Sequence, residues 1–89
     1  MLTSFEPIVA ALETTASLEW SYAGAAIGAG FAAFGAGFGI SRIGAAANEG
    51  IARQPEATND IRGGSVILSA FIEGVALFAV VVALLVALK

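Results

Sequence analysis

Two long stretches without charge dominate the pattern of polar and apolar positions along the chain. The first, Trp20 to Ser41, contains 22 residues, and the second, Gly63 to Leu88, contains 26 with one interruption at Glu73. A helix crosses about 30 Å of hydrocarbon with about 20 mostly apolar residues, and it satisfies its own backbone hydrogen bonds in lipid. The pattern therefore predicts an all-α membrane protein, an antiparallel hairpin of transmembrane helices over residues 20–47 and 63–89.

The positions of the charged residues predict how this hairpin is oriented. Arg42, Arg53 and Arg62 lie in or beside the connecting segment, and no basic residue precedes the first stretch. Short loops rich in Lys and Arg stay in the cytoplasm. We therefore expect a polar cytoplasmic loop over residues 48–62, with both termini on the opposite side of a membrane, most simply a bacterial inner membrane.

The segment before the first stretch, residues 1–19, has a different character. It carries three glutamates and lacks the basic start of a secretory signal. Its apolar residues follow helical spacing. The segment is predicted to be an amphipathic helix at the outer membrane interface, or an outward extension of the first helix.

The composition narrows the functional class. Apolar residues make up 58% of the 89 positions and charged residues 12%, whereas a soluble domain has about 25% charged residues. So short a chain cannot bury that much apolar surface in its own core. Four basic residues against seven acidic ones argue against nucleic-acid binding. Without Cys or His the chain lacks disulfides, thiolate metal ligands and the commonest catalytic base, and we expect no catalytic residue, metal or cofactor.

Small residues lie on two flanks of the first helix when it is drawn at about 100° per residue. One flank carries Gly24, Gly28, Gly35 and Gly39, and the other carries Gly30, Gly37 and Gly44. Between these flanks run an aromatic stripe of Ile27, Phe31, Phe34 and Phe38 and, at the back, a stripe of Ala25, Ala29, Ala33 and Ala36. Small residues permit close helix packing in membranes. Neighbours on both flanks favour a head-to-tail assembly that closes into a ring of identical copies; the simpler alternative is one face packed on the second helix.

Glu73 is the one charged residue inside the second stretch. It lies 11 residues after Arg62 and 16 before Lys89, which places it roughly 16 Å from one helix end at about 1.5 Å per residue. An acid at the membrane midplane costs at least about 2.5 kcal/mol, and such a residue marks a functional site by default. Because burial disfavours the charged form, we expect Glu73 to be a reversible proton site.

This combination resembles the c-subunit of the F-type ATP synthase, the proteolipid of the rotor ring. The segment Ala52-Arg53-Gln54-Pro55-Glu56-Ala57 is similar to the loop motif of that family, the acid follows Arg53 by 20 residues, and Gly35-x-Gly37-x-Gly39 is similar to its run of alternating glycines. The resemblance implies a closed ring with first helices inside and second helices outside. It also implies that Glu73 carries the ion past a stator subunit with an intramembrane arginine. Arg53, Gln54 and Pro55 would contact the central stalk, and Gly24, Gly28, Gly30, Gly35, Gly37 and Gly39 would pack the ring, which membrane lipids surround.

The same resemblance separates proton-carrying from sodium-carrying members. Sodium-binding members carry oxygen-bearing side chains at positions that here hold Ile40, Gly74, Val75 and Phe78. Hard cations require several oxygen ligands, so the chain is predicted to carry protons. The chain also lacks the G-x-x-x-x-G-K-[ST] nucleotide motif, so it is expected to be a transport component and not an enzyme. A sodium-coupled ring and a non-transporting structural hairpin remain the alternatives.

Overall fold

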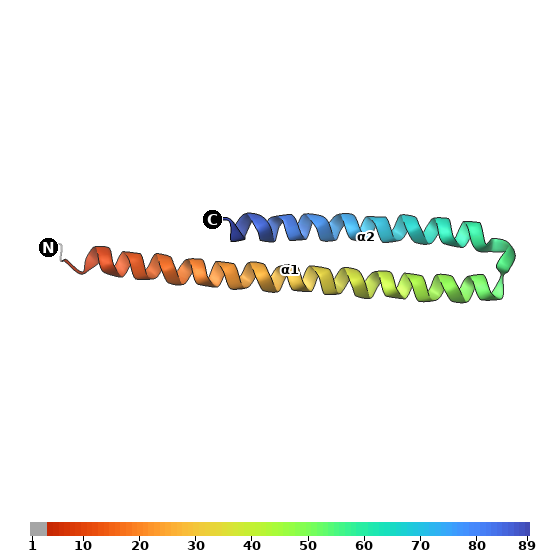
Figure 1. Ribbon diagram of the computed structural model, residues 1–89, viewed down its shortest axis with the longest axis horizontal. Coiled ribbons are helices and arrows are strands. Elements are labelled where there is room, and N and C mark those ends of the chain that lie inside the picture. Colours follow the sequence, from red (N-terminus) through yellow and green to blue (C-terminus); the bar gives the residue numbers. More distant parts are fainter. Residues whose placement is uncertain (1–3) are drawn as a thin grey trace.

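The computed structural model describes residues 4–89 as two long antiparallel helices joined by a tight turn (Figure 1). Helix α1 spans Glu6–Arg53, a short 3-10 helix η1 spans Pro55–Ala57, and helix α2 spans Thr58–Ala87. The result is a rod of 80 × 15 × 14 Å. The predicted two-helix hairpin is confirmed, and residues 1–3 of the predicted N-terminal segment lie outside the described part.

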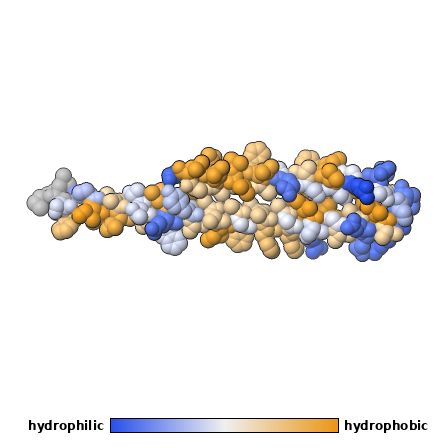
Figure 2. All heavy atoms as spheres, viewed as in Figure 1, coloured by the Kyte–Doolittle hydropathy of each residue, from blue (hydrophilic) through white to orange (hydrophobic). Residues whose placement is uncertain are grey.

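Both helices are long and apolar enough to cross a membrane. At about 1.5 Å per residue, the 48 residues of α1 and the 30 of α2 each exceed the hydrocarbon thickness of about 30 Å. Among residues 4–89 only Ala25 is buried. Figure 2 shows hydrophobic atoms along the middle of the rod and hydrophilic atoms gathered at the turn. So much exposed apolar surface requires lipid or other protein around the hairpin.

The connection between the helices is shorter than the predicted loop over residues 48–62. Residues 48–53 continue α1 and residues 58–62 already belong to α2. Charged residues mark where a helix leaves hydrocarbon but do not end it, whereas proline does, because it lacks an N–H and restricts the residue before it. Gln54, directly before Pro55, leaves the helical region with φ −135° and ψ 76°. The hydroxyl of Thr58 then donates to the Pro55 carbonyl oxygen at 2.6 Å as α2 begins.

Residues 6–19 form a straight continuation of α1 beyond the end of α2. No glycine or proline occurs between Ile8 and Ala23, so nothing in the sequence breaks the helix there. The hydroxyl of Tyr22 donates to the Lys89 carbonyl oxygen at 3.0 Å, which aligns Tyr22 with the end of α2. The 15 residues from Glu6 to Trp20 therefore extend alone by about 22 Å, as the left end of Figure 1 shows. Residues 6–19 thus form a helix that is continuous with the rest of α1.

The two helices pack mostly through small residues, at spacings of three, four or seven. The contact face of α1 includes Ser21, Ala25, Ala29, Ala32 and Ala36, and that of α2 includes Ile72, Ala76, Ala83 and Val86, all less exposed than their neighbours. This spacing is typical of helices that cross at about 20°. The alanine stripe at the back of the first helix thus faces α2, with one correction: Ala32 takes the place of Ala33, which is exposed.

Candidate ion-binding site

Glu73 is the sixteenth of the 30 residues of α2 and lies at the middle of its length. Its side chain is exposed on the hairpin. The one ion pair among residues 4–89 joins Arg53 to Glu49, so Glu73 has no basic partner in the hairpin. A carboxyl group without a counter-charge is costly to place in lipid.

A groove between the helices leads from Glu73 toward the turn. We call it the polar groove; its volume is about 450 Å³. Helix α2 lines it with a polar row at intervals of three, four and four residues: Arg62, Ser65, Ser69 and Glu73. Helix α1 lines it with one polar residue, Asn48, and with apolar or small residues: Ile40, Ile43, Gly44, Ala47 and Ile51. The polar row therefore connects the mid-helix carboxyl with the turn end of the hairpin.

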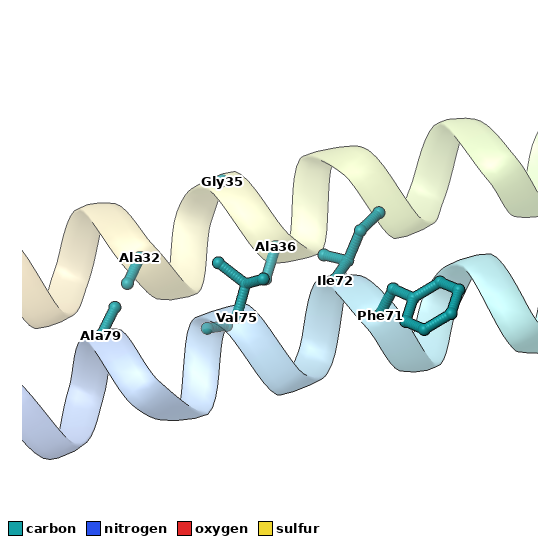
Figure 3. Close-up of a pocket in the computed structure, with 8 residues that line it drawn as sticks. Ala32, Gly35, Ala36, Phe71, Ile72, Val75 and Ala79 are labelled. Carbon is teal, nitrogen blue, oxygen red and sulfur yellow. The ribbon is translucent and has the colours of Figure 1, made fainter.

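The next groove toward the termini has a different lining. It has a volume of about 410 Å³ and is lined by Ala32, Gly35, Ala36, Phe71, Ile72, Val75, Ala76 and Ala79. In Figure 3 the side chains of Ala32 and Ala79 point toward each other between the two helices. None of these side chains has a polar atom. Glu73 lines the polar groove and not this apolar one.

The four residues predicted to line the ion site are only partly brought together with Glu73. Ile40 lines the polar groove with Glu73. Val75 lines the apolar groove, and the ring of Phe78 is 77% exposed on the outside of α2. Gly74 is half-buried. None of the four supplies a side-chain oxygen within the hairpin.

Sequence reasoning did not identify Ser65, Ser69 and Asn48 as residues of the polar groove. The signal for the serines was present, since intervals of three and four residues place Arg62, Ser65 and Ser69 on the same helix face as Glu73. No such signal was present for Asn48, because its place depends on how α1 and α2 are aligned.

The glycines predicted to pack the ring lie mostly on open faces of α1. A side chain added at Gly24, Gly28, Gly30, Gly35 or Gly37 would meet nothing within 4 Å. Gly39 differs, because a Cβ there would lie 3.3 Å from the Ile72 Cδ1 atom of α2. Five of the six glycines therefore leave space that the hairpin itself does not use.

The residues predicted to contact the central stalk lie at the turn. Arg53, Gln54 and Pro55 are all exposed. Arg53 pairs with Glu49 at 3.6 Å, with side chains 78% and 73% exposed, and exposed pairs of this kind contribute about 1 kcal/mol at most. The fold therefore gains little from Arg53, whose guanidinium is accessible to a partner.

Comparison with known proteins identifies the family of the chain. The model of a protein family described as the ATP synthase c-subunit matches residues 23–86. The chain belongs to this family. The match covers most of both helices and the whole turn, and it confirms the resemblance that the loop motif, the glycine run and Glu73 indicate.

Individual members of the ATP synthase c-subunit family are also similar to the chain. The ATP synthase c-subunit from Bacteroides thetaiotaomicron is 62% identical over 73 residues, which cover 82% of this chain and 86% of that protein. The one from Phocaeicola vulgatus is 51% identical over 74 residues, covering 83% and 88%. A chloroplastic one from Phaeodactylum tricornutum is 47% identical over 64 residues, covering 72% and 78%. No solved structure matches the chain. Membership of this family assigns the chain to ion transport through the membrane in ATP synthesis.

Proposed function

We propose that the chain is the proton-carrying subunit of the rotor ring of an F-type ATP synthase. Many identical copies form a closed ring, and Glu73 of each copy takes up and releases one proton as the ring turns. The observation that carries this proposal is the single carboxyl group at the middle of α2, without a basic partner among residues 4–89. An acid inside a membrane is energetically costly, and such a residue therefore marks a functional site by default.

The open faces of α1 support the proposal that copies of the chain form a ring. The exposed glycines on its two flanks leave room for a neighbour on each side, and small residues are the contacts that membrane helices use for close approach. A head-to-tail contact between different faces closes into a ring when the rotation per copy permits. The aromatic stripe of Phe31, Phe34 and Phe38 is exposed on the side away from α2 and would face the inside of the ring.

Neutrality of the carboxyl sets the order of steps. Glu73 releases its proton where a stator subunit presents an arginine and an aqueous path, and it is protonated again before it returns to lipid. An ionised carboxylate could not make that passage cheaply. One charge moved across 100 mV is worth about 2.3 kcal/mol, so several copies must pass the stator for each ATP.

Protons fit the site better than sodium ions do. Ile40, Gly74, Val75 and Phe78 supply no side-chain oxygen. Of the two hydroxyls in the polar groove, only that of Ser69 is within one helical turn of Glu73. Hard cations require a fuller set of oxygen ligands. A proton requires only the carboxyl and one hydrogen-bond acceptor.

The proposal also covers the membrane boundaries of the helices and the role of the turn. Residues 20–47 and 63–89 lie in the bilayer as parts of longer helices, with Trp20 and Tyr22 at the outer interface, where aromatic residues gather. Arg53, Gln54 and Pro55 face the cytoplasm and contact the central stalk. The chain itself catalyses no reaction and needs no cofactor.

Labelling with dicyclohexylcarbodiimide tests the proton assignment, because this reagent modifies protonated carboxyl groups in apolar surroundings. We expect modification at Glu73 of the intact complex, unchanged by sodium ions and lost at high pH, with Glu13 of the same chain as the unmodified control. Mass spectrometry of the extracted chain locates the label. Protection by sodium ions would establish the sodium-coupled alternative, and absence of label at Glu73 would contradict the proposal altogether.

A further inference from the structure

We propose that Ser69 is the positioning residue for the Glu73 proton: its hydroxyl oxygen accepts the hydrogen bond of the neutral carboxyl. This inference rests on the proposed function, in which Glu73 carries the proton. It adds the hydrogen-bond partner that the family's sodium-binding positions, Ile40, Gly74, Val75 and Phe78, do not provide in this chain.

The helix brings the two side chains together. Ser69 is four residues before Glu73 on α2, and residues at this spacing have Cβ atoms about 5–6 Å apart on one helix face. Side chains of a helix lean toward its N-terminus. The carboxyl of Glu73 therefore leans toward the preceding helical turn of α2, which carries Ser69. Both residues line the polar groove.

The hydroxyl of Ser69 is available for this role. Serine in a helix often donates to a carbonyl one turn back, as Ser65 does to the Ile61 oxygen at 2.7 Å and Ser41 to the Phe38 oxygen at 2.8 Å. Within residues 4–89 no such bond is made by Ser69, which is half-buried in the groove. A hydroxyl oxygen has two acceptor sites and can receive the carboxyl O–H directly.

No other side chain competes for the carboxyl proton inside the hairpin, as far as residues 4–89 show. The next polar side chain of the row, Ser65, is eight residues from Glu73, about 12 Å along the axis. The other ionisable group lining the groove is Arg62, 11 residues or about 16 Å away on the same helix. Helix α1 contributes no ionisable group to this groove, only Asn48 near the turn.

Loss of this acceptor destabilises the protonated form relative to the ionised one. One hydrogen bond contributes about 1 kcal/mol net, and 1.36 kcal/mol corresponds to one pH unit. In the complete complex in inverted membrane vesicles, Ser69→Ala is expected to lower the pH at which half of the dicyclohexylcarbodiimide labelling of Glu73 is lost, by about 0.5–1 unit. Ser69→Thr keeps the hydroxyl and is expected to restore the wild-type midpoint.

Ser41→Ala is the matched control, because Ser41 lies outside the polar groove and its hydroxyl already bonds to the Phe38 carbonyl oxygen; its midpoint should equal that of the wild type. If Ser69→Ala prevents ring assembly, Ser69→Cys replaces it, since a thiol of similar size is a weaker acceptor and should give a smaller downward shift. An unchanged or raised midpoint in the assembled variant would overturn the role of Ser69 alone. Absence of labelling in the wild type would instead reject the proton-carrying role of Glu73.

Discussion

Replacing Glu73 by Gln is expected to abolish both ATP-driven proton pumping and proton-driven ATP synthesis, to background, while the ring still assembles. Glutamine has the shape of glutamic acid but cannot release a proton, so the copy that reaches the stator cannot exchange with either aqueous path. Because Glu73 makes no ion pair among residues 4–89, the substitution removes no ion pair of the hairpin. Pumping is measured by quenching of a pH-sensitive dye in inverted vesicles, and assembly by native electrophoresis of the detergent-extracted complex.

Two control variants show whether a loss of pumping is specific to the Glu73 carboxyl group. Glu73→Asp keeps a carboxyl at the same helical position and should retain part of the pumping. Glu13→Gln removes an acid from the extension of α1 beyond α2 and should leave pumping unchanged. Pumping by Glu73→Gln would contradict the proton-carrying role, whereas loss of the ring in that variant would make Glu73 a structural residue.

A bulky residue on a glycine flank is expected to prevent or alter ring assembly without disturbing the hairpin. Gly35→Val adds a Cβ atom that would meet nothing of the same chain within 4 Å, and two γ-carbons beyond it. Valine is a slightly better helix former than glycine, so the isolated hairpin should not lose stability. In the ring, a tightly packed neighbour would suffer overpacking of about 1–3 kcal/mol at each contact, and this cost repeats around the ring.

Native mass spectrometry of the purified oligomer measures this effect as a loss of rings or as a changed copy number. Phe31→Val is the matched control: Phe31 is 73% exposed in the hairpin but belongs to the aromatic stripe and not to either glycine flank. It should leave the copy number unchanged. Normal rings from Gly35→Val, with an unchanged copy number, would show that the flank carrying Gly35 is not a contact between copies.

The sequence alone was sufficient to predict the hairpin and its central acid. In a membrane the length of an uncharged stretch determines a spanning helix, and a single acid within it is conspicuous because nothing else there ionises. Glu73, the loop motif around Arg53 and the run from Gly35 to Gly39 lie close enough to family patterns to be recognised without coordinates. The matched family model over residues 23–86 confirms that recognition.

The helix ends and the groove could not be predicted in the same way. Charge patterns indicate a membrane boundary, but the ends of α1 and α2 depend on backbone chemistry at Gln54 and Pro55, and so both helices continue into the predicted polar segment over residues 48–62. The polar groove depends on the alignment of α1 against α2, because Asn48 and Ile40 reach it from a helix of which the sequence pattern gives the faces but not the register. The rotation of α1 about its own axis likewise determines that Ala32, and not Ala33, faces α2.

Infrared spectroscopy of the isolated ring tests the central claim most directly, since the carbonyl stretch of a neutral carboxylic acid differs from that of a carboxylate. The ring, reconstituted in lipid without its stator at neutral pH and in sodium-containing buffer, is predicted to show a neutral carboxyl band that disappears in the Glu73→Gln ring. A wild-type ring in which Glu73 gives only the carboxylate signal would contradict a carboxyl that crosses lipid by holding a proton.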